Sequence, residues 1–168
     1  MLLNVIIDWY GKCSAVVRWE SSFSRCFSLM CGVRQGGVLS PFLFAIYVDD
    51  MIVNLQNRRL GCTVGGIYIG CIMYADGLVL FSASLSVLQQ MVNTCEQEMT
   101  YLDMKFNTNK SMVLRIDKAY RRTCDNICLY GIGLQFVSTA KYLGIYVKSA
   151  SALKLSFLES RSKFFLVC

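Results

Sequence analysis

Three aspartates in apolar surroundings are the residues of this sequence best suited to bind a metal ion. Asp76 is the one charged residue of the stretch CIMYADGLVLF (71–81), and Asp49 and Asp50 stand together in YVDD (47–50). Carboxylate oxygens are the ligands that Mg²⁺ prefers, so either stretch could supply part of a magnesium site. Asp76 also suits a plain hairpin corner, because Asp-Gly between apolar runs favours a tight turn.

The helical context of Asp49 and Asp50 argues against a shared metal ion. Ser40 suits a helix N-cap and Pro41 the first helical position, and the predicted helix runs to about Asn57. Neighbouring positions of a helix point about 100° apart, so the two carboxylates would not converge on one ion. We therefore interpret this acidic pair as the solvated side of an otherwise buried helix.

Strands and a second helix are predicted around Asp76. Residues 64–82 indicate strands, with a tight hairpin at 75–78. A helix follows, capped by Ser84 or Ser86, and Gln89 would complete a capping box from Ser86. Its apolar positions share one helical face: Leu85, Leu88, Met91, Val92, Cys95, Met99 and Leu102.

The rest of the chain extends this mixed pattern. Before these elements, we expect a helix over residues 1–10 and two strands over 13–19 and 26–33. After them, we expect a turn and strand within 104–116 and a hairpin pair within 127–147. The tail from Ser149 is predicted to be weakly helical. The predicted fold is a single α+β domain, with two helices packed against an antiparallel sheet and extra hairpins.

The apolar composition raises the question of a membrane protein. Hydrophobic residues make up 55% of the 168-residue chain, and the mean hydropathy is +0.45. The longest apolar stretches contain polar residues and are shorter than the roughly 18 to 20 residues that a bilayer requires. The N-terminus also lacks the basic start and cleavage site of a signal peptide. A buried, sheet-rich core is the favoured explanation, with a small membrane protein as the alternative.

The numbers of charged residues, histidines and cysteines limit the reactions and partners that this chain could have. The net charge of +6 gives mild support for a polyanionic partner, but on charge alone ordinary solvated surface is the favoured explanation. No histidine is present, which excludes a Ser-His or Cys-His nucleophile. The nine cysteines include no CxxC pair, and several lie in apolar runs, which is typical of a reducing, intracellular setting.

The blocks GVRQGGVLSPFLFAIYVDDM (32–51) and CIMYADGLVLFS (71–82) follow one another in the sequence. In this order they resemble the palm of a reverse transcriptase of the non-LTR (LINE-like) retrotransposon type. LDMKFNTNKSMVL (102–114) resembles the segment whose lysine approaches the incoming nucleotide, and STAKYLGIYV (138–147) resembles the primer-grip hairpin. WYGKCSAVVRW (9–19) is similar to the stretch before the glutamine loop of these enzymes. The resemblance covers nearly the whole chain.

This resemblance implies roles for individual residues. Arg34, Gln35 and Gly36 would lie at the incoming deoxynucleotide and template base, with Tyr74 near the primer end. Asp76 would bind catalytic magnesium, and Lys110 would sit near the triphosphate, where it could donate a proton to the leaving pyrophosphate. The primer strand would be held by Tyr142, Leu143 and Gly144. The partners implied are an RNA template, a DNA primer and deoxynucleotide triphosphates.

The mechanism implied by the resemblance is phosphoryl transfer with two Mg²⁺ ions, and the sequence departs from it. The usual Tyr-Ala-Asp-Asp reads Tyr-Ala-Asp-Gly, so Gly77 supplies no carboxylate. The family's other essential carboxylate is expected upstream of Met1, since the early acid Asp8 lies in a helix-like segment outside that motif. Fingers and most of the thumb are expected to be absent. One carboxylate would not offset the mutual repulsion of two divalent ions.

These departures lead to a specific functional hypothesis. We expect residues 1–148 to be a truncated reverse-transcriptase palm that is inactive as an isolated chain, and 149–168 to be the start of a thumb-like or disordered tail. The alternative is a catalytically dead module that binds RNA or primer–template. It predicts salt-sensitive binding.

Overall fold

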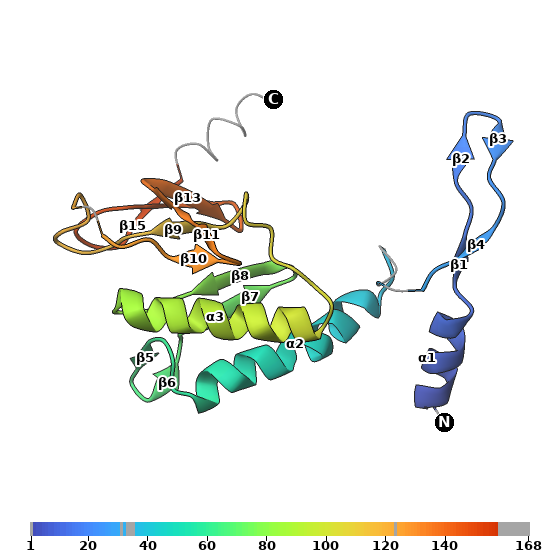
Figure 1. Cartoon of the computed structure of the whole chain (residues 1–168), viewed down its shortest axis with the longest axis horizontal. Coiled ribbons are helices and arrows are strands. Elements are labelled where there is room, and N and C mark those ends of the chain that lie inside the picture. Colours follow the sequence, from blue (N-terminus) through green and yellow to red (C-terminus); the bar gives the residue numbers. More distant parts are fainter. Residues whose placement is uncertain (1, 31, 33–35, 123, 158–168) are drawn as a thin grey trace. The chain divides into compact units, whose positions relative to one another are not determined.

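The computed structural model describes residues 2–30, 32, 36–122 and 124–157, and it divides the chain into two compact units (Figure 1). The first unit is Met1–Ala45 and the second is Ile46–Cys168. The boundary falls inside the helix α2 (Ser40–Asn57), whose bounds match the helix predicted from Ser40 to about Asn57.

The first unit consists of a helix followed by a narrow ribbon of strands. Its elements are α1 (Leu2–Gly11), β1 (Ser14–Ala15), β2 (Arg18–Trp19), β3 (Ser22–Phe23) and β4 (Phe27–Ser28). β1 pairs with β4 and β2 pairs with β3, both antiparallel, so the chain turns back at Glu20 and Ser21, between the two predicted strand regions. None of the apolar side chains described in this unit is buried.

The core of the second unit forms where two helices pack against a hairpin. α2 lies beside α3 (Leu85–Tyr101), and the hairpin is made of β7 (Cys71–Tyr74) and β8 (Gly77–Leu80) (Figure 1). The buried members of this cluster come from both helices: Met51, Leu55, Met91, Cys95 and Met99. Alternate residues of the hairpin, Cys71, Met73, Leu78 and Leu80, pack against them. The predicted apolar face of the second helix is thus confirmed.

A second apolar cluster lies on another side of α3. It joins Val92 to strands further along the chain: β9 (Met112–Leu114), β10 (Cys128–Leu129) and β12 (Gln135–Val137). The strand β11 (Ile132–Gly133) is exposed and does not belong to the cluster. β10 and β11 form an antiparallel hairpin, whereas β9 and β12 pair in parallel. Because α3 contributes to both clusters, it is the central element of this unit.

The remaining strands form a three-stranded sheet and one small hairpin. β13 (Thr139–Tyr142), β14 (Ile145–Lys148) and β15 (Lys154–Ser156) pair in that order, all antiparallel. β5 (Thr63–Val64) and β6 (Ile67–Tyr68) form the hairpin. The expectation of a weakly helical tail from Ser149 is wrong for residues 154–156, because these extend the sheet as a third strand. Residues 158–168 lie outside the described residues.

The predicted α+β class is confirmed, but the sheet is more divided than expected. Within the described residues the strands form seven sheets of two or three strands, not one antiparallel sheet. The parallel pair is also unexpected. A parallel connection needs a dozen or more residues, and here the segment between β9 and β12 carries the β10–β11 hairpin. Hydrophobic alternation predicts a strand, but it does not say which distant strand pairs with it.

The composition is only partly explained by burial. Many large apolar side chains are exposed, among them Trp19 at 77% and Met30 at 90% of their full accessible surface. The buried core therefore accounts for fewer apolar residues than the composition suggested. None of the helices within the described ranges is both long enough and apolar enough to cross a bilayer.

Candidate functional site

Asp76 lies in the two-residue turn between β7 and β8, where it is exposed to solvent. Tyr74 and Gly77 pair directly across the hairpin, so the turn consists of Ala75 and Asp76. The hairpin is confirmed, but Gly77 of the predicted Asp-Gly turn lies outside the two-residue loop. The residue with a left-handed backbone is Ala75, at a φ of 50°, and Gly77 is an ordinary strand residue. A glycine is therefore not needed at position 77 to form the turn.

The predicted primer-grip hairpin contacts this turn through Tyr142. Its hydroxyl donates a hydrogen bond to the backbone carbonyl of Gly77 over 3.2 Å. A Cβ atom added to Gly77 would lie 3.3 Å from both Cε2 of Tyr142 and the carbonyl oxygen of Tyr74. The Tyr142 ring thus occupies the space next to position 77. Burial raises the pKa of Tyr142, and the nearby Cys71 thiol adds to the effect.

Leu143 and Gly144 form the tight turn between β13 and β14. Tyr142 pairs with Ile145, which leaves these two residues as the loop, with φ values of 49° and 81°. A left-handed backbone is unusual for leucine, and such strained positions are often functional. The Leu143 side chain is 57% exposed, so it is available to a ligand at this tip.

Lys110 lies in a compact loop before β9. The side-chain oxygen of Asn107 accepts hydrogen bonds from the backbone N–H groups of Asn109 (3.0 Å) and Lys110 (3.2 Å). The side chain of Lys110 is exposed. Within the described residues, no hydrogen bond or ion pair joins Lys110 to Asp76, so their predicted cooperation at one nucleotide stays a prediction.

The glutamine loop is only partly described. Arg34 and Gln35 lie outside the described residues, and their predicted nucleotide contacts are untested. Gly36 is exposed, with a φ of 80°, and a Cβ there would meet no atom within 4 Å. The backbone at Gly36 therefore has the open surroundings and the left-handed conformation for which glycine is suited.

The other acidic candidates lie on helices. Asp49 and Asp50 are both exposed on α2, as predicted, but the helix is not otherwise buried, because Ile46, Tyr47 and Val53 are exposed as well. Asp8 lies on α1 and forms an exposed ion pair with Lys12, at 2.6 Å between Oδ1 and Nζ. Its position in a helix confirms that it does not stand in the expected strand motif.

The acidic side chains at the turn do not fit a two-ion magnesium centre. In the described part of the chain, no three His, Cys, Asp or Glu side chains are grouped so that they could hold a metal ion. Position 77 contributes a carbonyl oxygen that already accepts the Tyr142 hydroxyl. One exposed carboxylate, Asp76, is too few ligands for two divalent ions.

The links between α3 and the strands were not predicted. Gln89 holds β10 by two hydrogen bonds of 2.8 Å, because its amide nitrogen donates to the carbonyl of Cys128 and its oxygen accepts the Cys128 N–H. The predicted capping box from Ser86 is therefore wrong. Ser84 caps the helix, and its Oγ accepts the N–H of Val87 at 3.2 Å. The sequence does not distinguish a glutamine in the first turn of a helix that caps the helix N-terminus from one that bonds to a distant strand.

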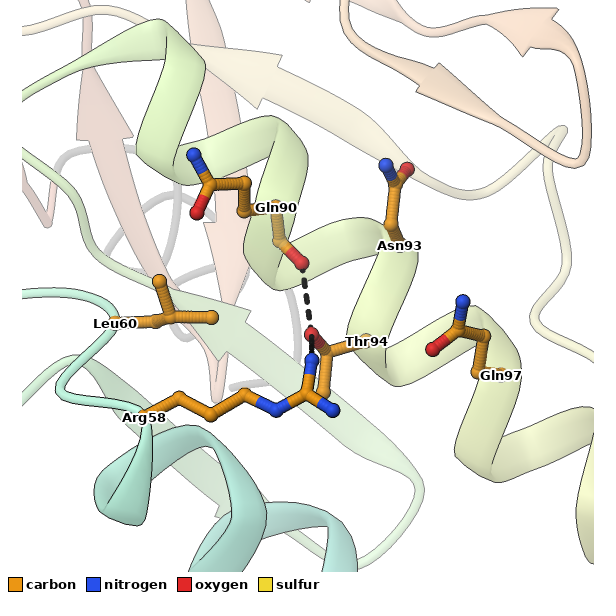
Figure 2. Close-up of a pocket in the computed structure, with 6 residues that line it drawn as sticks. All are labelled: Arg58, Leu60, Gln90, Asn93, Thr94 and Gln97. Carbon is orange, nitrogen blue, oxygen red and sulfur yellow. Dashed lines mark hydrogen bonds between the residues drawn. The ribbon is translucent and has the colours of Figure 1, made fainter.

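A polar pocket of about 340 Å³ opens between the end of α2 and α3 (Figure 2). It is lined by Arg58, Leu60, Gln90, Asn93, Thr94 and Gln97. The guanidinium of Arg58 donates to Oγ1 of Thr94 at 3.4 Å, and Thr94 in turn donates to the carbonyl of Gln90 at 2.9 Å. Asp76 does not line this pocket, and no sequence pattern indicated it.

Comparison with known proteins identifies the family. The family model described as reverse transcriptase (RNA-dependent DNA polymerase) matches residues 3–147. A Pol polyprotein from the type-2 retrotransposable element R2DM of Drosophila melanogaster is 29% identical over 93 residues, covering 55% of this chain and 9% of that protein. The Pol polyprotein from the type-1 element R2 of Popillia japonica is 30% identical over 96 residues, covering 56% of the chain and 14% of that protein.

A third relative extends the match over more of the chain. The RNA-directed DNA polymerase from the mobile element jockey of Drosophila funebris is 26% identical over 143 residues, which is 82% of this chain and 15% of that protein. The chain therefore belongs to the reverse transcriptase family, among the enzymes of non-LTR retrotransposons. It spans less than a sixth of the length of each of these relatives. Reverse transcriptases use divalent metal ions, nucleic-acid templates and primers, and nucleotide substrates.

Proposed function

We propose that this chain is a reverse-transcriptase palm segment that holds an RNA template and a DNA primer but does not polymerise by itself. The observation that carries this proposal is the contact between the two motifs: the Tyr142 hydroxyl bonds to Gly77, directly beside Asp76. A primer held at the tip of the β13–β14 hairpin would thus end near the turn that carries Asp76.

The roles of the individual side chains follow from their positions. The exposed Leu143 and the backbone of Gly144 contact the primer strand at the hairpin tip. Tyr74 is 64% exposed at the end of β7, so its ring is free to pack against the primer end. Lys110 attracts the triphosphate as a point charge. Gln35 and Gly36, with Arg34, contact the nucleotide and template base, as the family motif implies.

The lack of polymerase activity follows from the number of carboxylates at the turn. Two Mg²⁺ ions held close together repel each other, and several hard oxygen ligands must offset that repulsion. Asp76 supplies one carboxylate, and Gly77 supplies none. The side chains of this chain therefore bind and orient nucleic acid, while the metal-dependent chemistry requires further carboxylates.

Primer extension tests the catalytic part of this proposal. The purified chain is incubated with Mg²⁺, deoxynucleotide triphosphates and a DNA primer annealed to an RNA template. We expect no extension above that of Asp76→Asn. Robust extension that Asp76→Asn abolishes would show that the carboxylates present are sufficient, and the inactive assignment would be wrong.

The second candidate is a binding module without any catalytic role, favoured by the net charge of +6. Fluorescence anisotropy with a labelled RNA–DNA hybrid over a range of salt concentrations measures this binding. The logarithm of the affinity should fall linearly with the logarithm of the salt concentration. Absent or salt-independent binding would contradict both the binding module and the primer–template role above.

A further inference from the structure

The three-stranded sheet β13–β14–β15 has two chemically different faces. In an antiparallel sheet, residues directly opposite one another project from the same face. Lys141 pairs with Tyr146, which pairs with Ser156, and Lys148 pairs with both Thr139 and Lys154. Because successive residues alternate, all six side chains lie on one face. Three of the six are lysines.

The opposite face is apolar and is attached to the turn of Asp76. It carries Ala140, Tyr142, Ile145, Val147 and Leu155. Tyr142 fastens this face to the β7–β8 hairpin through its hydrogen bond to Gly77. The lysine side chains therefore project away from that hairpin, and all three lysine residues are exposed.

Within the described residues, no ion pair compensates the positive charge of the lysine-bearing face. Residues 126–157 contain no aspartate or glutamate, and none of the three lysines forms an ion pair with another described residue. Lys148 and Lys154 lie directly opposite each other, and like charges in that position destabilise a sheet. The Nζ atom of Lys141 lies 5.6 Å from the centre of the Tyr146 ring, which holds this ammonium group over the sheet.

We propose that this surface, called here the lysine face (Lys141, Tyr146, Lys148 and Lys154), binds the phosphate backbone of a nucleic acid. A phosphate between Lys148 and Lys154 would remove their repulsion and release counterions. Contacts to phosphates position a strand without reading its sequence, so binding at this face is independent of base sequence. The inference takes its nucleic-acid partner from the proposed function, and it adds a second contact surface on the far side of the primer-holding hairpin.

Two triple variants of the full chain test the proposal. One changes Lys141, Lys148 and Lys154 to glutamine. The control changes Lys12, Lys105 and Lys118 to glutamine, which alters the net charge equally at exposed positions off the sheet. With a fluorescein-labelled RNA–DNA hybrid, the lysine-face variant should lose affinity, and its salt slope should shrink by about 3 in magnitude, which is about 1 for each lysine removed. The control should keep a slope close to that of the unmodified chain.

The outcomes separate this inference from the proposed function. If the unmodified chain binds the hybrid and both triple variants show the same slope, the lysine face is not a binding surface, although the primer–template role stands. If the unmodified chain does not bind the hybrid, both proposals are wrong. Binding to vesicles containing phosphatidylserine in place of the hybrid would overturn the choice of partner.

A stability measurement checks the premise of like-charge repulsion. Lys148→Gln alone should raise the urea midpoint at low salt, and the difference should disappear at high salt as the charges are screened. A lower midpoint for Lys148→Gln at low salt would contradict the premise, because it would mean that the lysine stabilises the sheet without a ligand.

Discussion

The hydroxyl of Tyr142 donates a hydrogen bond to the backbone carbonyl of Gly77, over 3.2 Å, between two motifs that are 65 residues apart in the sequence. This contact joins the turn that carries Asp76 to the hairpin that carries Leu143. Gly77 permits it, since a side chain there would begin 3.3 Å from the Tyr142 ring. The absence of a side chain at position 77 therefore leaves room for the Tyr142 ring beside this turn.

Tyr142 and position 77 should be coupled in their effect on stability. Tyr142→Phe should lower the free energy of unfolding by about 0.5 to 1.5 kcal/mol, the usual worth of one hydrogen bond. Gly77→Ala should destabilise the unmodified chain more than it destabilises Tyr142→Ala, in which the ring is gone. Urea unfolding of the four chains of this double-mutant cycle gives the coupling energy, expected above about 0.5 kcal/mol.

The control for Tyr142→Phe is Tyr101→Phe, because the Tyr101 residue is 86% exposed. It should change the free energy of unfolding by less than about 0.5 kcal/mol. Strict additivity of Gly77→Ala and Tyr142→Ala would mean that the two positions do not compete for space.

Gln89 should be more important to the second unit than its neighbour on the same helix. Its side-chain amide makes two hydrogen bonds to the backbone of Cys128, which is half-buried. Gln89→Ala leaves the N–H and the carbonyl of Cys128 without these partners, and it should lower the free energy of unfolding by about 1 to 3 kcal/mol. The control is Gln90→Ala, at the next position of the same helix, where the residue is exposed. Because the same residue type is replaced, the change in helix propensity is the same, and the free energy of unfolding should fall only a little. Equal urea midpoints for the two variants would mean that the hydrogen bonds between Gln89 and Cys128 do not stabilise the protein.

The cap of α3 distinguishes two serines that the sequence left as alternatives. Ser84 accepts the N–H of Val87, so Ser84→Ala should destabilise the protein by about 1 kcal/mol. Ser86→Ala should have a much smaller effect, because alanine is favoured inside a helix. Thermal unfolding by circular dichroism measures both, and a larger loss for Ser86→Ala would reverse the assignment.

Two thiols in the core of the second unit should make the stability depend on alkaline pH. Burial raises the pKa of Cys71 to about 11 and that of Cys95 to about 12, from an ordinary value of 9.0. For Cys95 the charges of Cys71 and Glu98 add to the burial. The folded state thus favours the neutral thiols. Their stabilisation is fully present below a pH of about 9 and is lost as the pH rises through the folded pKa values.

Urea unfolding at pH values below and above the ordinary thiol pKa measures whether the stability falls as the pH rises. The free energy of unfolding should fall as the pH rises from about 9 towards about 12, and Cys95→Ala should show a shallower fall. Alkylation at neutral pH provides a second readout, in which the exposed Cys26 should react well before Cys95. A rise in stability above a pH of about 9 would contradict the assignment.

The sequence predicted those features that depend on local patterns. The bounds of α2, the apolar face of α3 and the hairpin around Asp76 follow from caps, helical periodicity and a turn between apolar runs. The exposure of Asp49 and Asp50 also followed from their position on a helix. These features are decided by residues a few positions apart, which is why they can be derived without the fold.

The features that were missed depend on residues far apart in the sequence. Neither the parallel pairing of β9 with β12 nor the bridge from Gln89 to Cys128 leaves a local pattern. The turn was also misassigned in detail, since it was predicted at 75–78 around Asp-Gly, whereas the loop consists of Ala75 and Asp76 and Ala75 has the left-handed backbone. The opposed pair of Lys148 and Lys154 becomes visible only when the strand register is known.

The most direct test of the central claim is primer extension on a sample that has first been shown to bind the RNA–DNA hybrid. The unmodified chain and Asp76→Asn are compared with Mg²⁺ and deoxynucleotide triphosphates on the same primed RNA template. We predict that both bind the hybrid and that neither lengthens the primer. Extension by the unmodified chain that is lost in Asp76→Asn would contradict the account, because Asp76 would then complete a working metal centre.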